Sequence, residues 1–181
     1  MRSGCFRKSF STSRASDRLT SFPVSDANAS SRMSDPSSSR MFERTLDELD
    51  ALLDRATVIA IGPGLGRGDW GRAMLRAVLA SDKPLVLDAD GLNLLAIESA
   101  FRENWILTPH PGEAARLLKM TPAEVEADRF AAVEDLALRF GGVAVLKGAG
   151  SLIASKTDGA VALCAAGNPG MASGGMGDVL T

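Results

Sequence analysis

A glycine-rich stretch near the end of the chain surrounds a single carboxylate, and this combination could do chemistry. The stretch runs from Asn168 to Thr181, and its acid, Asp178, directly follows Gly177. Glycines let backbone N–H groups approach an anion closely, and a helix that begins there points its positive end at that anion. A carboxylate beside a bound phosphate can act as a base that takes a proton from a substrate hydroxyl. The alternative is that Asp178 is an ordinary capping acid at a helix N-terminus.

A cation, two glycines and a hydroxyl follow a short apolar run farther up the chain. They form the segment Lys147, Gly148, Ala149, Gly150 and Ser151. Such a run suits the phosphate or ribose of a nucleotide, because the lysine supplies charge and the glycines expose backbone amides. The alternative is a surface turn with a solvated lysine.

Three further acids and one histidine also follow apolar runs. His110 is the single histidine and lies between two prolines, which fix its position. Glu113 would either cap the following helix or help place a magnesium ion on phosphates. Asp88 and Asp90 could likewise help place a magnesium ion, or cap the helix that follows them.

The segment Gly62–Gly68 contains four glycines at alternate positions. It is not a dinucleotide-binding fingerprint, because Arg67 stands where G-x-G-x-x-G needs its third glycine. The chain also has no Walker A motif and no G-x-S-x-G elbow, which argues against a P-loop enzyme and a serine hydrolase. Glycines here can still contact a ligand through backbone amides, or form only a tight turn.

Strands and helices alternate along the part of the chain that must position these residues. Apolar runs predict strands at 57–61, 84–87, 105–108 and 143–146, and a hairpin of 152–155 with 160–164. The first strand is expected to be covered on both faces, and 84–87 and 143–146 to be buried. Helical spacing predicts helices at 42–56, 69–80, 92–100, 113–119 and 121–140, the last with a capping box of Thr121 and Glu124 and an end at Gly141. This alternation predicts an α/β fold with a mostly parallel sheet and helices on both faces. The motifs would then meet at the carboxyl ends of the strands, where such sheets bind ligands.

The first 44 residues differ from the rest. They are rich in serine and arginine and have no sustained period, so residues 1–44 are predicted to be disordered, and residues 45–181 to form the folded domain. Residues 1–22 carry several basic residues and a single acid, at position 17, and one interpretation is a mitochondrial transit peptide. Otherwise a cytoplasmic protein is expected.

Composition excludes some classes of function. The net charge of −2 argues against a nucleic-acid footprint, and no apolar run reaches the roughly 20 residues that a membrane helix needs. The two cysteines, Cys5 and Cys164, form no metal-binding spacing and fit a reducing compartment. The sequence does not decide whether the chain forms a homo-oligomer.

Five motifs occur in an order that matches a known family. GPGLG, LDADGLN, TPHPGE, KGAGS and NPGMASGGMGD resemble the ADP-dependent NAD(P)H-hydrate dehydratases, over about Leu46 to Thr181. The resemblance implies a ribokinase-like fold. It also implies a repair reaction in which ADP, or ATP in eukaryotic members, phosphorylates the hydroxyl on the ring of hydrated NAD(P)H. Loss of phosphate then restores NAD(P)H, and ADP leaves as AMP.

The same resemblance assigns roles to the residues. It implies that Asp178 is the base on the hydroxyl and that His110, Gly66 and Gly64 contact the hydrated dinucleotide. It places the adenine nucleotide on Lys147 to Ser151 and Gly177. Glu113 would lie near Mg²⁺, which would accompany the ADP or ATP.

This chain also departs from the family. Members have a further glycine-rich strand and helix before Leu46 and continue past Thr181, so we expect a domain that is incomplete at both ends. This predicts that the chain alone is unstable or inactive. A small-molecule kinase of the same fold, acting on a vitamin precursor or a sugar, and a non-catalytic nucleotide-binding fragment stay as alternatives.

Overall fold

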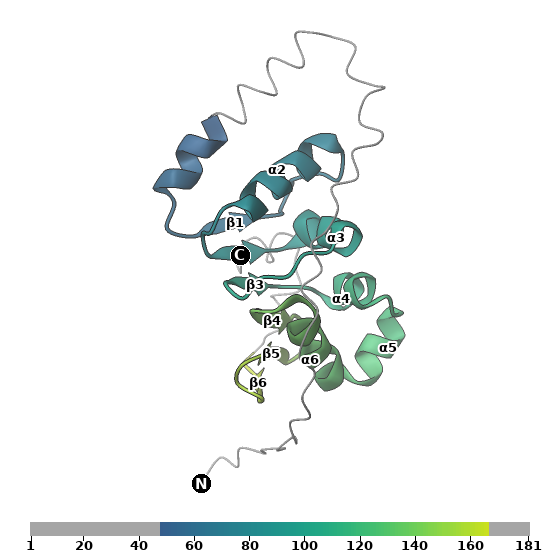
Figure 1. Cartoon of the computed structure of the whole chain (residues 1–181). Helices are drawn as coiled ribbons and strands as arrows, with labels where there is room; N and C mark the ends of the chain where they lie inside the picture. The colour runs from purple at the N-terminus through teal and green to yellow at the C-terminus, as the bar shows by residue number, and fades with distance from the viewer. Residues whose placement is uncertain (1–47, 167–181) are drawn as a thin grey trace, which may run out of the picture.

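The computed structural model describes residues 48–166. A helical segment at 48–55 precedes the first strand, and the elements then alternate along the chain (Figure 1). They are β1 (Ile59–Ile61), α2 (Asp69–Ala80), β2 (Leu85–Leu87), α3 (Ala89–Glu98), β3 (Trp105–Leu107), α4 (Pro111–Leu118), α5 (Pro122–Ala127), α6 (Arg129–Phe140), β4 (Val143–Leu146), β5 (Ser151–Ser155) and β6 (Val161–Cys164).

The strands form a six-stranded mixed sheet in the order β1-β2-β3-β4-β5-β6. Strands β1 to β4 are parallel, with Leu87 opposite Ile61 and Leu107, and β5 and β6 are antiparallel. The predicted α/β class, mostly parallel sheet and hairpin are confirmed. The parallel part places the carboxyl ends of four strands on one edge.

Helices α2 to α6 lie on one face of this sheet (Figure 1), so the expectation of helices on both faces is not met by the helices that connect the described strands. Alternate strand residues are almost fully buried, such as Leu87, Leu107 and Leu146, each at 0% exposure. Their neighbours on the other face are partly open, with Ile106 at 40% and Ile153 at 36%. The cause is topological, because right-handed crossovers between strands that advance in one direction put every connecting helix on the same side. Figure 1 shows α3, α4 and α6 together on that side.

Strand β1 is less covered than the sequence predicts. Ala60 is exposed, and Val58, just before the strand, is 55% exposed. The expectation that 57–61 is covered on both faces is wrong for the described structure, because Ala60 lies in register with Val86 and Ile106, on the face of the sheet that is partly open.

The segment predicted as one helix over 121–140 is two helices. The predicted capping box of Thr121 and Glu124 is present and begins α5. At Asp128 the backbone leaves helical geometry, with φ −143° and ψ 81°, and the side chain accepts a hydrogen bond from the N–H of Ala131. Asp128 therefore ends α5 and caps α6, since aspartate satisfies the first amides of a helix well. The predicted end at Gly141, with φ +80°, is confirmed.

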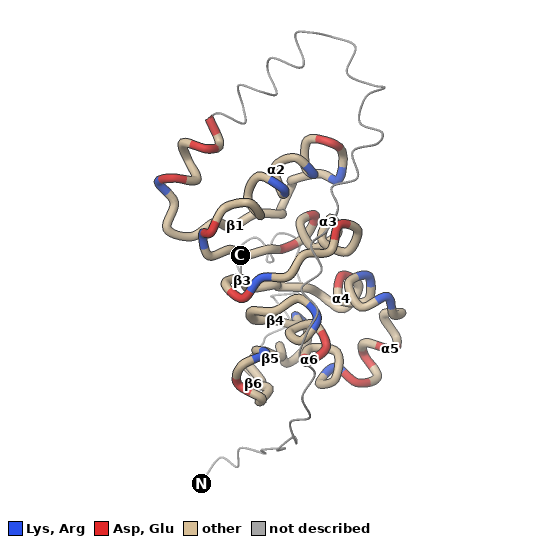
Figure 2. The backbone as a smooth tube through the Cα atoms, viewed as in Figure 1, with Lys and Arg blue, Asp and Glu red and all other residues tan. Residues whose placement is uncertain are grey.

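Charged residues of both signs are dispersed over the described elements (Figure 2). Within residues 48–166, no helix has the length and apolar character to cross a membrane.

Candidate active site at the carboxyl ends of the strands

Four loops meet at the carboxyl edge of the parallel strands, because hydrogen bonds join each loop to a neighbouring strand or loop. The N–H of Asp88 donates to the carbonyl of Ile61 at 3.2 Å, and the N–H of Thr108 donates to that of Leu87 at 3.1 Å. The N–H of Lys147 donates to the carbonyl of Pro109 at 2.8 Å. Segments that are far apart in sequence therefore form one rim.

An ion pair lies at the centre of this rim. Lys147 Nζ is 2.7 Å from Asp88 Oδ1, and the two side chains are only 20% and 3% exposed. The same Oδ1 accepts from the N–H of Ala89 at 2.8 Å and so caps α3. The structure thus excludes a solvated lysine at position 147. Lysine and aspartate fix each other across two loops.

Asp90 holds the glycine-rich loop after β1. Its Oδ2 accepts a hydrogen bond from the N–H of Gly66 at 3.0 Å, and Arg67 Nε lies 3.9 Å from Oδ1. Between the two acids, Ala89 has a φ of +47°, a backbone region that costs a non-glycine residue about 1 kcal/mol. Such strain is kept where the surroundings fix it, and it often marks functional sites. Asp88 and Asp90 thus hold two different loops: Asp88 holds the loop of Lys147, and Asp90 holds the loop of Gly66.

His110 and Glu113 form the start of α4. The N–H of His110 donates to Glu113 Oε2 at 2.8 Å, and His110 Nδ1 accepts from the N–H of Gly112 at 3.0 Å. Because Nδ1 accepts, the proton of the neutral ring lies on Nε2. Nε2 is 3.4 Å from Glu113 Oε1, while about half of the imidazole side chain, 51%, is exposed. His110 is therefore oriented by its neighbours and accessible at the rim.

Glu113 is a buried acid among charged neighbours. Burial raises the pKa of its carboxyl above the ordinary value of 4.5. The hydrogen bond from the His110 backbone and the charges of His110 and Lys147 oppose this rise, and Asp88 adds to it. Desolvation of the carboxylate is the dominant cause.

The described residues do not form a direct cage for Mg²⁺. Both oxygens of Glu113 face His110, and residues 48–166 contain no group of three or more acids, histidines or cysteines placed to hold a metal ion. Glu113 therefore does not fit a direct metal ligand, and its predicted place near magnesium stays a prediction. Its visible role is the predicted capping of α4.

The loop that holds Lys147 to Ser151 depends on a residue that the sequence analysis missed. Arg129, the first residue of α6, donates to the carbonyls of Ala149 at 2.9 Å, Lys147 at 3.3 Å and Leu146 at 3.4 Å. Arg129 lies 17 to 20 positions before the residues that it contacts, so no local sequence pattern links it to this loop. The break at Asp128, if recognised as a helix cap, would have placed Arg129 in the first turn of α6 but would not have shown which loop it contacts.

The remaining predicted site residues lie in two groups. Gly64 and Gly66 have positive φ angles of 67° and 74°, and a Cβ built on either would meet nothing within 4 Å, so the loop surface there is open. Asp178 and Gly177 lie outside the described residues. The structure thus brings Asp88, Asp90, His110, Glu113 and Lys147 to one rim and does not describe the position of the predicted base.

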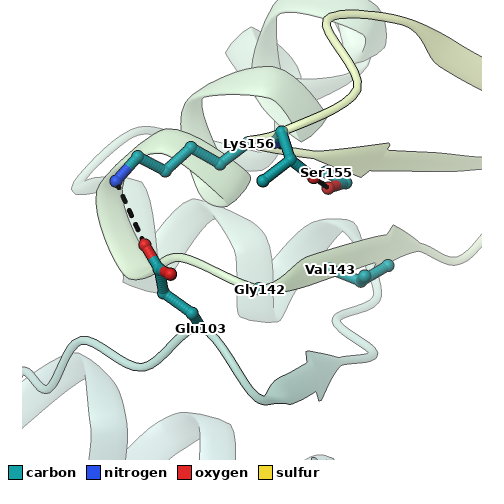
Figure 3. Close-up of a pocket in the computed structure, with 6 residues that line it drawn as sticks. Glu103, Gly142, Val143, Ser155 and Lys156 are labelled. Atoms are coloured by element: carbon teal, nitrogen blue, oxygen red, sulfur yellow. Dashed lines mark hydrogen bonds and ion pairs between the residues drawn. The ribbon is translucent and has the colours of Figure 1, made fainter.

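A shallow hollow of about 180 Å³ lies at the opposite edge of the sheet (Figure 3). It is lined by residues that precede β3 and β4 and residues at the end of β5, among them Glu103, Gly142 and Lys156. Lys156 Nζ lies 3.6 Å from Glu103 Oε1, and both side chains are exposed. The hollow brings none of the sequence motifs together.

Comparisons with known proteins point to one family. A family profile described as NAD(P)H-hydrate dehydratase matches residues 19–181. The bifunctional NAD(P)H-hydrate repair enzyme Nnr of Coxiella burnetii is 57% identical over 135 residues, which are 75% of this chain and 28% of that protein. The chain thus spans less than a third of that relative.

Two solved structures share the fold. A ribokinase-like superfamily protein from Enterococcus faecalis matches with a TM-score of 0.66 and 31% identity, over 77% of this chain and 49% of that one. The ADP/ATP-dependent NAD(P)H-hydrate dehydratase from Bacillus subtilis, co-crystallised with ATP and Mg²⁺, matches with a TM-score of 0.58 and 37% identity, over 69% of this chain and 44% of that one. The fold is therefore ribokinase-like, as the motifs predict. The profile match and the shared fold together show that this chain belongs to the NAD(P)H-hydrate dehydratase family.

Proposed function

We propose that this chain carries out the ADP-dependent dehydration of hydrated NAD(P)H, a repair of damaged nicotinamide nucleotides. The adenine nucleotide phosphorylates the hydroxyl on the hydrated ring. Phosphate then leaves, the ring double bond re-forms as a proton is lost, and NAD(P)H, AMP and phosphate result. The observation that carries the proposal is the rim itself, where the motif loops after four parallel strands share hydrogen bonds and one buried ion pair.

The rim has two sides. Asp90 holds the Gly66 loop on one side, and Asp88 is paired with Lys147 on the other. Gly64, Gly66 and His110 would face the hydrated dinucleotide, since these glycines are open and half of the imidazole is exposed. Lys147, Gly148, Ala149, Gly150 and Ser151, with Gly177, would hold the adenine nucleotide. Asp178 would take the proton from the ring hydroxyl as it attacks the phosphoryl group, which is how positioned carboxylates act in phosphoryl transfer.

The phosphoryl donor would be ADP or ATP with Mg²⁺. Support comes from the Bacillus subtilis dehydratase, which was co-crystallised with ATP and Mg²⁺. Bound Mg²⁺ would neutralise charge on the phosphates. Because Glu113 is engaged by His110, we assign no protein ligand to the ion and no step to it.

The test is to incubate the chain with ADP, Mg²⁺ and hydrated NADH and to follow the near-ultraviolet absorbance of reduced nicotinamide together with AMP. We expect both products to appear together in a version that spans the full length of the relatives, and Asp178→Asn in that version to abolish both. Because the chain spans only part of its relatives, product identity rather than rate decides the outcome. Consumption of ATP against a small alcohol, without return of NADH, would instead identify a kinase. Nucleotide binding without any turnover would leave a non-catalytic nucleotide-binding protein.

We further propose that hydrated NAD(P)H and the adenine nucleotide are the partners of this chain and that it works in the cytoplasm. Self-association would be checked by sedimentation.

A further inference from the structure

Arg129 holds the backbone of the loop between β4 and β5 from behind. Its guanidinium donates to three successive parts of that loop, the carbonyls of Leu146, Lys147 and Ala149, at 2.9–3.4 Å. The side chain is only 16% exposed, so it belongs to the interior of the molecule rather than to its surface. Arginine suits this task, because its planar group presents several donors in a fixed geometry.

The loop is shaped around this guanidinium. Gly148 has a φ of +153°, and a Cβ added to it would lie 2.6 Å from Arg129 Nη2. Glycine is therefore needed there both for its backbone conformation and for the space that Arg129 occupies. The loop and Arg129 therefore fit each other closely, although Arg129 lies 18 positions before Lys147 in the sequence.

The direction of the three carbonyls fixes the direction of the amides. In a trans peptide the C=O and the N–H point opposite ways. The carbonyl of Lys147 shares its peptide with the N–H of Gly148, and the carbonyl of Ala149 shares its peptide with the N–H of Gly150. Since both carbonyls point at Arg129, both N–H groups point away from it. No hydrogen bond joins either amide to another residue of the described part of the chain.

Two outward amides and a nearby cation make a site for an anion. Successive backbone N–H groups in such turns form concave binding sites for phosphate. The buried guanidinium adds positive charge from behind, and the nearest carboxylate to its Nε, that of Glu126, is 3.9 Å away and 53% exposed. Lys147 lies in the same loop, held by Asp88.

We propose that Arg129 is a positioning residue, which orients the Gly148 and Gly150 amides toward the phosphate of the adenine nucleotide without touching it. This inference rests on the proposed function, because it assigns the phosphate to the nucleotide. It predicts that Arg129 controls nucleotide affinity and leaves affinity for the hydrated dinucleotide unchanged, since the Gly66 loop is held separately by Asp90.

The experiment compares Arg129→Gln and Arg129→Lys with Arg139→Gln in the full chain, by calorimetric titration with ADP and Mg²⁺. Arg139 is the matched control, because it lies on the same helix and makes one long hydrogen bond, at 3.4 Å, to the carbonyl of Leu118. We expect Arg129→Gln to weaken ADP binding about tenfold or more, Arg129→Lys to restore part of it, and Arg139→Gln to stay within about twofold. Affinity for hydrated NADH should stay within about twofold in every variant.

A second readout keeps this inference separate from the proposed function. The amide NMR signals of Gly148 and Gly150 should shift in ligand-free Arg129→Gln while those of Gly64 and Gly66 do not. If the wild-type chain binds no ADP, the proposed function fails whatever these signals show. If it binds ADP and Arg129→Gln binds it equally well, or if the variant weakens both ligands alike, the positioning role is wrong. Should Arg129→Gln not fold, the Arg129→Lys variant with the same titrations decides.

Discussion

The charged residues of the rim act mainly on one another. Asp88 meets Lys147, Asp90 meets the Gly66 amide, and Glu113 meets His110. Each pair links two loops or caps a helix, so the groups that a ligand would meet are already fixed in place. Such preorganisation is what electrostatic stabilisation of a reacting phosphate requires.

Asp88→Asn should destabilise the fold, because it leaves Lys147 without a charged partner in a mostly buried place. The variant keeps an oxygen for the α3 cap, so that hydrogen bond is preserved. We expect a cost of about 1.5–3 kcal/mol in the free energy of unfolding, the range for hydrogen bonds to charged groups. Chemical denaturation measures it, with the exposed Asp135→Asn as a control expected within about 0.5 kcal/mol of wild type. The Asp88→Asn, Lys147→Met double variant should cost less than the sum of the single changes, and strict additivity would show that the pair does not interact.

Glu113→Gln tests the buried carboxyl by its pH dependence. Glutamine preserves the capping box but carries no charge. Because the folded-state pKa of Glu113 is raised, the folded state holds its proton more tightly, and wild-type stability is lost as pH rises from about 4.5 through that raised pKa. The variant should therefore gain on wild type over this window. Urea titrations at a series of pH values measure the difference, and a variant that loses ground as pH rises would show that His110 and Lys147 outweigh burial.

At the scale of elements, the strand ends and the turns after them position the site. Gly62 directly follows β1 with a φ of +135°, and a Cβ there would overlap the carbonyl oxygen of Asp88. This contact brings the β1 turn against the first turn of α3. The glycine is required by backbone contact rather than by a ligand.

Gly62→Ala should therefore be far more damaging than Gly64→Ala. The first adds a backbone clash to an unfavourable φ, so we expect a loss of several kcal/mol or failure to fold. The second has the positive φ alone, with open space around it, and should cost about 1–2 kcal/mol. Thermal unfolding of both variants measures the contrast. Equal effects would mean that the approach of Gly62 to Asp88 is not as the structure has it.

The sequence predicts elements well where the signal is local. Helix α2 and strand β4 begin and end at the predicted residues, and the Thr121 capping box is present, because periodicity and capping depend on near neighbours. The break at Asp128 was missed, since the apolar spacing of α5 and α6 reads as one continuous helix. The Lys147–Asp88 pair and the Arg129 contacts were also missed, because they depend on the packing of the sheet. Lys147 and Asp88 are 59 positions apart, and Arg129 is up to 20 positions from the residues that it contacts.

At the scale of the whole molecule, the connecting helices of residues 48–166 cover one face of the sheet, and in this part of the chain the other face is partly open. Leu107 and Ile106 are neighbours on β3, yet they are 0% and 40% exposed. The core therefore lies between the sheet and α3, α4 and α6 (Figure 1).

This asymmetry predicts unequal costs for two adjacent substitutions. Leu107→Ala should cost about 2–5 kcal/mol, as for other fully buried leucines. Ile106→Ala should cost clearly less, because part of its side chain already contacts solvent. Guanidinium denaturation curves of both variants provide the comparison, and a larger loss at Ile106 would contradict the assignment of the covered face.

The most direct test of the central claim is to follow backbone amide signals while ADP and Mg²⁺ are added to the chain. Ligand binding at the carboxyl edge of the strands should shift the signals of residues 147–151, led by Gly148 and Gly150, and leave those around the hollow at Glu103 and Lys156 unchanged. Shifts that gather at that opposite edge, or no shifts at all, would contradict the assignment of the nucleotide to this rim.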